Sequence, residues 1–102
     1  MAPHNRARGE TLLEIDGRPR RLCVTLGALA ELEAAFDVAS MAELAERLGG
    51  LTAADLIHVL AALTAGGGEA MDASALCAAS IDPKRAAIAV ADAFRLAFDG
   101  ED

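Results

Sequence analysis

The stretch CVTLGALAELEAAF, from Cys23 to Phe36, passes from a strand pattern to a helix pattern with no linker between them. Thr25 is a residue type that caps helices, and Leu29, Leu32 and Phe36 recur at the spacing of one helix face. A helix that follows a strand so closely has to pack on the nearest apolar surface. The sequence therefore predicts that this helix folds back onto the sheet to which the strand belongs.

The sheet itself is predicted to be a β-hairpin. Glu10–Ile15 and Arg20–Leu26 both alternate, and the turn-forming sequence DGRP, residues 16–19, separates them. An Asp16-Gly17 loop of two residues would set Leu13 opposite Arg20, whereas a four-residue loop sets Leu13 opposite Leu22. Because the four-residue loop pairs apolar with apolar side chains, it is the one we expect. Its apolar face would hold Thr11, Leu13, Ile15, Leu22, Val24 and Leu26.

Capping signals predict three further helices. SMAE (Ser40–Glu43) and TAAD (Thr52–Asp55) have the spacing of a capping box, and Asp82-Pro83 supplies the cap and first residue of a final helix. Gly49-Gly50 ends one of these helices, and the GGG run of residues 66–68 ends another and is expected to be a flexible connector. A weaker turn or two of helix is expected between residues 72 and 80. The apolar faces would be Met41, Leu44 and Leu48; Leu56, Val59, Leu60 and Leu63; and Ala87, Val90, Ala91, Phe94 and Phe98.

These elements predict a single α+β domain over residues 9–99, with an N-terminal β-hairpin followed by about four short helices packed on it. The polar ends, residues 1–8 and 100–102, are expected to be disordered. The core should be aliphatic, because the chain has three Phe and neither Tyr nor Trp among its 102 residues.

The charge distribution argues against nucleic acid as the usual partner. The formal net charge is −7, and the sequence after Leu22 carries four basic and thirteen acidic residues. The arginines before that point leave a small DNA-binding or toxin-neutralising regulator as an alternative. The sequence shows no secretion signal and no apolar run of about 18 residues, so we expect a cytoplasmic protein that does not enter a membrane.

No residue pattern indicates catalysis, a metal or a cofactor. His4, Cys23, His58 and Cys77 stand singly, without the paired spacing of a zinc site. The GGG run lacks the Gly-Lys-Ser/Thr ending of a phosphate-binding loop. We therefore expect a protein that is not an enzyme and that binds no cofactor.

Binding through helices is the function class that remains. Leu44, Leu48, Leu56 and Leu60 lie on short helices that are less directly tied to the hairpin, so they are the residues we expect on a protein-binding surface. The alternative, that these four leucines simply fill the protein's own core, is equally consistent with the pattern.

Three segments carry a resemblance to a known family: GETLLEIDGRPRRLCVTLGALAELEAAFDV, MAELAERL and LTAADLIHVLAAL. They resemble short proteins of gene transfer agents and tailed phages that are described both as tail tube proteins and as tail assembly chaperones. The resemblance covers about residues 8–98. It implies tape measure and tail tube proteins as partners, a bacterial producer cell, and a possible homo-oligomer.

Between the two descriptions, the predicted fold favours the chaperone. A tube subunit needs a mostly β wall, and one hairpin supplies few strands. The expectation is therefore a tail assembly chaperone that binds the tape measure or tail tube protein, and the alternative is a structural tail component retained in the particle.

Overall fold

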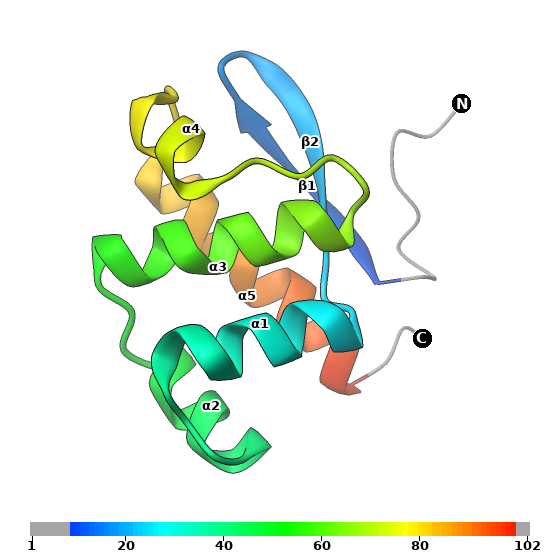
Figure 1. Cartoon of the computed structure of the whole chain (residues 1–102). Helices are drawn as coiled ribbons and strands as arrows, with labels where there is room; N and C mark the ends of the chain where they lie inside the picture. The colour runs from blue at the N-terminus through cyan, green and yellow to red at the C-terminus, as the bar shows by residue number, and fades with distance from the viewer. Residues whose placement is uncertain (1–8, 100–102) are drawn as a thin grey trace.

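The protein is an α+β domain with an N-terminal hairpin followed by helices, as predicted. The hairpin lies between the helices (Figure 1). The computed structural model describes residues 9–99, so the disorder predicted for residues 1–8 and 100–102 lies outside the described residues. The elements are β1 (Glu10–Ile15), β2 (Arg18–Cys23), α1 (Leu26–Phe36), α2 (Met41–Leu48), α3 (Ala53–Gly66), α4 (Ala73–Ala78) and α5 (Pro83–Asp99).

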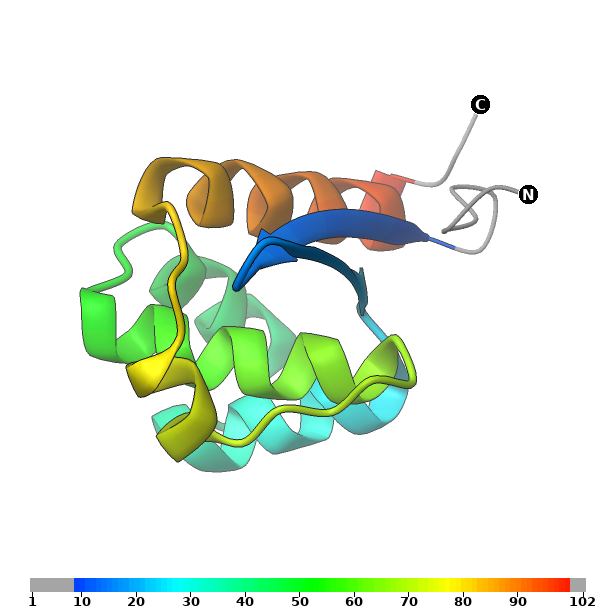
Figure 2. The same cartoon turned by 90° about the horizontal axis from the view of Figure 1, so that it is seen from above.

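The helices are arranged in layers on both sides of the hairpin. Seen from above, α5 lies on one side of the hairpin and α3 on the other, with α1 outside α3 (Figure 2). Helix α5 packs against β1, α3 packs against β2, and α2 packs against α1. Strand β1 is therefore covered by α5, the last helix in the described part of the chain.

The predicted hairpin register is wrong. Strand β2 begins at Arg18, the loop is the two-residue Asp16-Gly17 turn, and Leu13 lies opposite Arg20. Asp16 has φ 55° and Gly17 has φ 77°. Two successive left-handed residues give a turn whose twist matches that of a hairpin, and Asp and Gly adopt this conformation readily. The geometry of the turn, rather than the pairing of apolar side chains, sets the register.

The turn is also tied to the other end of the domain. The Asp16 N–H donates to the Ser80 carbonyl at 2.9 Å, and the Ser80 N–H donates to Asp16 Oδ1 at 2.7 Å. This pair of hydrogen bonds fixes the tip of the hairpin to the segment between α4 and α5.

The prediction that α1 folds back onto the hairpin is also wrong. Thr25 caps α1 as predicted, because its Oγ1 accepts a hydrogen bond from the Ala28 N–H at 3.1 Å. Helix α1 then packs against α3, and the strands are contacted mainly by α3 and α5. Leu26, expected on the apolar face of the sheet, instead lies in the first turn of α1 and is 85% exposed.

The other helix starts follow the capping signals, with one difference. Thr52 and Asp55 form a complete capping box at the start of α3. Ser40 accepts from the Glu43 N–H, but the Glu43 carboxylate accepts from the Ala39 N–H at 2.7 Å, one residue before the cap. The weak helical signal between residues 72 and 80 corresponds to α4, which has six residues.

The GGG run is a packing site and not the flexible connector that we expected. A Cβ on Gly66 would lie 2.1 Å from the Cys23 carbonyl oxygen, and a Cβ on Gly67 would lie 2.2 Å from the Arg21 carbonyl oxygen. Glu69 follows directly, and its carboxylate accepts a hydrogen bond from the Arg21 N–H at 3.0 Å. The end of α3 therefore closes the outer edge of β2.

A single, mostly aliphatic core lies between these layers. It draws on both strands and all five helices of the described residues. Its largest fully buried side chains are Ile15, Leu22, Leu32, Leu44, Leu63, Val59 and Thr64.

Candidate functional site

An apolar groove between α2 and α5 is the best candidate for a functional site. Its volume is about 500 Å³. Helix α5 forms one wall, and α2 with the residues that follow it forms the other. The lining residues are Ala45, Leu48, Gly49, Leu51, Ala87, Val90, Ala91, Phe94 and Phe98.

Helix α5 forms a wall of the groove because its apolar face is wider than the part that packs into the core. The core takes one part of this face, which includes Ala86, Ala89 and Ala93. The part predicted from the sequence, from Ala87 to Phe98, borders this buried part and lines the groove. Phe94 is 8% exposed and Phe98 is 52% exposed, and their rings stack with centroids 5.9 Å apart.

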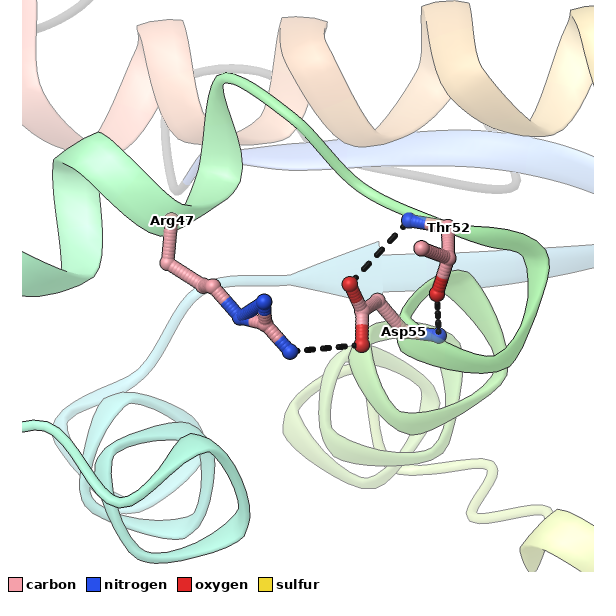
Figure 3. Close-up of polar contacts among 3 residues, drawn as sticks. All are labelled: Arg47, Thr52 and Asp55. Carbon is pink, nitrogen blue, oxygen red and sulfur yellow. Dashed lines mark hydrogen bonds and ion pairs between the residues drawn. The ribbon is translucent and has the colours of Figure 1, made fainter.

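The α2 wall is held in place by a polar contact with the start of α3 (Figure 3). Arg47, in the last turn of α2, donates to Asp55 Oδ1 at 2.9 Å. Its guanidinium also lies over the Phe36 ring, 4.8 Å from the centroid. Leu44 of α2 is fully buried in the core. Together these contacts join α2 to α1 and α3, so the position of this wall depends on Arg47 and Asp55.

Asp55 has a pKa below its usual 3.8. The hydrogen bond that its carboxylate accepts from the Thr52 N–H, at 3.1 Å, contributes most to this lowering. The side chain of Thr52 and the positive charge of Arg47 lower the pKa further, against the opposing effect of burial. The carboxylate is thus held charged as both a helix cap and the partner of Arg47.

The four leucines predicted to bind a partner occupy different environments. Leu44 and Leu60 are 0% and 2% exposed and belong to the core. Leu48 is half-buried and lines the groove, and Leu56 is half-buried against the core. The structure does not bring the four together on one surface. Their role in binding stays a prediction, and Leu48 is the one placed at the candidate site.

Sequence reasoning missed the α5 residues as a binding surface. The helical spacing of Ala87, Ala91, Phe94 and Phe98 was visible, but spacing alone does not tell whether a neighbour covers an apolar face. Here α2 packs against α1 and so leaves this face of α5 partly open.

The described residues present no metal-ligand cluster. Within residues 9–99, no group of three or more His, Cys, Asp and Glu side chains lies close enough to hold a metal ion. Cys23 is buried and Cys77 is exposed, and neither forms a disulfide within the described residues. Among the helices that the structure describes, none is long and apolar enough to cross a membrane.

Comparison with known proteins identifies the family. The model of the family described as phage tail tube protein, GTA-gp10, matches residues 8–100. The chain belongs to this tail tube family. The match covers the hairpin and all five described helices, so the resemblance seen in the sequence is confirmed at the level of a gene transfer agent or phage tail family. No curated protein and no solved structure matches the chain.

Membership in the tail tube family associates the protein with phage or gene transfer agent tails and suggests other tail proteins as its class of partner. The apolar α2–α5 groove is the surface at which such a partner has the most apolar area to cover.

Proposed function

We propose that the protein is a structural component of the tail of a phage or gene transfer agent, and that it binds other tail proteins through the α2–α5 groove. The family match over residues 8–100 is the observation that carries this proposal. The groove supports the second part, because exposed apolar surface on a small acidic domain is stabilised when another protein covers it.

A transient tail assembly chaperone, which binds the tape measure or tail tube protein and then leaves, is the second candidate. The observation that favours it is the sheet, which has two strands in the described part of the chain. A wall made of strands needs edges that pair from subunit to subunit. Here α3 and Glu69 close the outer edge of β2, which leaves less strand edge for such a wall.

The two candidates differ in where the protein ends up. Mass spectrometry of purified tailed particles should detect this chain at a copy number comparable to that of other tail proteins if it is structural. A chaperone would be detected in the producing cells and be missing from the particles.

Deletion of the gene tests the role in tails that both candidates share. We expect tailless particles in the deletion strain, seen by electron microscopy, and normal tails when the gene is restored on a plasmid. Normal tails in the deletion strain would exclude both candidates.

A further inference from the structure

We propose that the α2–α5 groove receives one amphipathic α-helix of a partner protein, and that acidic residues on this helix lie beside Lys84 and Arg95. The proposal rests on the proposed function, because it names the kind of partner segment that the tail protein binds.

The shape and chemistry of the groove fit a helix. The lining residues of α5 extend from Ala87 to Phe98, a length of about 16 Å, or three helical turns. Small residues on both walls, such as Ala45 and Ala91, allow the backbone of another helix to approach closely. An extended segment would place its backbone N–H and C=O groups against apolar walls, whereas a helix satisfies those groups internally.

The outer border of the groove on α5 is basic. Lys84 lies three residues before Ala87 and Arg95 four residues after Ala91, so both fall just beyond the lining residues on the solvent side, and both are exposed. Three of the four basic residues that follow Leu22 are on α5, whereas the rest of that sequence is strongly acidic. An acidic flank of a bound helix is therefore attracted to this border and repelled by most of the remaining sequence after Leu22.

Arg95 retains donors for such a partner. It forms an ion pair with Asp92, one turn earlier on α5. A guanidinium carries five N–H donors in a planar fork, so a second carboxylate can bind on its other side.

The positions of Lys84 and Arg95 predict the spacing of the acidic residues on the partner helix. Lys84 and Arg95 are eleven residues apart, and eleven residues bring a helix back to nearly the same face after about 16 Å. The bound helix should therefore carry two acidic residues eleven positions apart, along one flank of its apolar stripe. No two Asp or Glu residues of this chain are eleven positions apart. A second copy of the chain lacks this pattern, so we assign the groove to a different protein.

A synthetic helical peptide can test this inference directly. The probe is a fluorescein-labelled peptide of about 18 residues with a Leu/Ala stripe and two Glu residues eleven positions apart, and its twin has Gln in place of both Glu. Fluorescence anisotropy at low salt should show the wild-type protein binding the Glu peptide roughly three- to tenfold more tightly than the Gln peptide. Binding of the Glu peptide should weaken as salt is added.

Three protein variants separate the contribution of the basic border from that of the apolar groove to peptide binding. Lys84→Gln with Arg95→Gln should remove the preference for Glu and leave binding of the Gln peptide unchanged. Arg85→Gln is the matched control, because Arg85 lies on the β1 side of α5 and should leave the preference intact. Ala91→Trp should fill the groove and abolish binding of both peptides. Ala91 is exposed, so this variant should fold, and circular dichroism checks that it does.

Three results would overturn the inference: no binding of either peptide by the wild type at millimolar concentration, equal binding of the two peptides, or unchanged binding in Ala91→Trp. Light scattering provides a fourth such result. If the wild type is a dimer and Ala91→Trp is a monomer, the groove binds a second copy of the chain and not a different protein. Any of these results, together with tailless particles from the deletion strain, would remove this inference and leave the tail function standing.

Discussion

Gly66 and Gly67 show how the absence of a side chain positions one element against another. At Gly66, the last residue of α3, and at Gly67, which caps it, the backbone comes so close to a carbonyl oxygen of β2 that a Cβ would lie little more than 2 Å away from it. Contacts of this kind involve backbone on both sides, so neither partner can rotate out of the way. These two glycines therefore fix the distance between α3 and the hairpin.

Gly67→Ala should destabilise the protein by about 3 kcal/mol, because the added methyl group forces α3 away from β2. Urea denaturation measures the change in the free energy of unfolding. Gly50→Ala is the matched control, since a Cβ there meets nothing within 4 Å, and it should leave the free energy of unfolding nearly unchanged. Equal stability of the two variants would show that the contact carries no strain.

Asp55 gives the stability a pH dependence. Folding lowers the pKa of this carboxyl below 3.8, so the stabilisation is present above about pH 3.8 and is lost as the pH falls through the lower pKa of the folded state. Asp55→Asn removes the charge, so it should be less stable than the wild type near neutral pH. The difference in free energy of unfolding should shrink below about pH 3.8. A difference that stays constant down to about pH 2 would contradict this assignment.

At the scale of elements, the backbone N–H groups of β2 alternate between pointing toward β1 and pointing away from it. Because the Arg21 N–H donates to Glu69, it points away from β1, so the N–H groups of its neighbours Arg20 and Leu22 point toward β1. Pro19, two residues before Arg21, occupies an outward position where the missing N–H costs no ladder bond.

This alternation of the β2 N–H groups can be tested by substitution. Arg20→Pro removes an N–H that donates to β1, so we expect it to destabilise the protein by about 3 kcal/mol or more. Pro19→Thr should change the stability by less than about 1 kcal/mol, because the N–H that it adds points outward. If instead the two substitutions had equal effects in urea denaturation, the assignment of the Arg20 N–H to the β1 side and of position 19 to the outer side would be contradicted.

Features set by residues close together in the sequence were predictable, whereas features set by tertiary packing were not. The caps at Thr25 and Thr52 were predictable, because the side chain and the N–H that it accepts from lie within three residues of each other. The hairpin register was not predictable. Pairing rules place a leucine opposite Leu13, but the structure places half-buried Arg20 there. The aliphatic part of a long arginine side chain can cover an apolar neighbour as a leucine would.

The candidate site was predictable only in part, for the same reason. The periodicity of α5 revealed the apolar face from Ala87 to Phe98, but whether a face is covered depends on where α2 packs. Leu44 and Leu48 illustrate the limit, since they lie four residues apart on α2, yet one is in the core and the other lines the groove. Spacing identifies an apolar stripe, and the surrounding packing decides which part of it a partner can reach.

At the scale of the whole molecule, the two ends of the described chain depend on each other. Helix α5 packs against β1, and the Thr11 hydroxyl donates to the Ala89 carbonyl at 3.3 Å, 78 residues further along the chain. Leu13 and Ile15 of β1 and Ala86 and Ala93 of α5 are all buried in the shared core.

A chain that ends at Asp82 should therefore fail to fold, because its β1 loses the helix that covers it. Circular dichroism during heating should show no cooperative transition for this truncated chain. Addition of a synthetic α5 peptide, residues 83–99, should restore one in proportion to its concentration. A cooperative transition without the peptide would contradict the dependence of β1 on α5.

The packing of β1 against α5 also sets an order of events during synthesis. Strand β1 leaves the ribosome well before the 17-residue helix that covers it, so the apolar face of the nascent hairpin stays exposed to water until α5 has been synthesised. Ribosomes that stall before α5 is complete would release a product in which β1 has no helix to pack against. Such a product is a natural substrate for the cell's quality-control proteases.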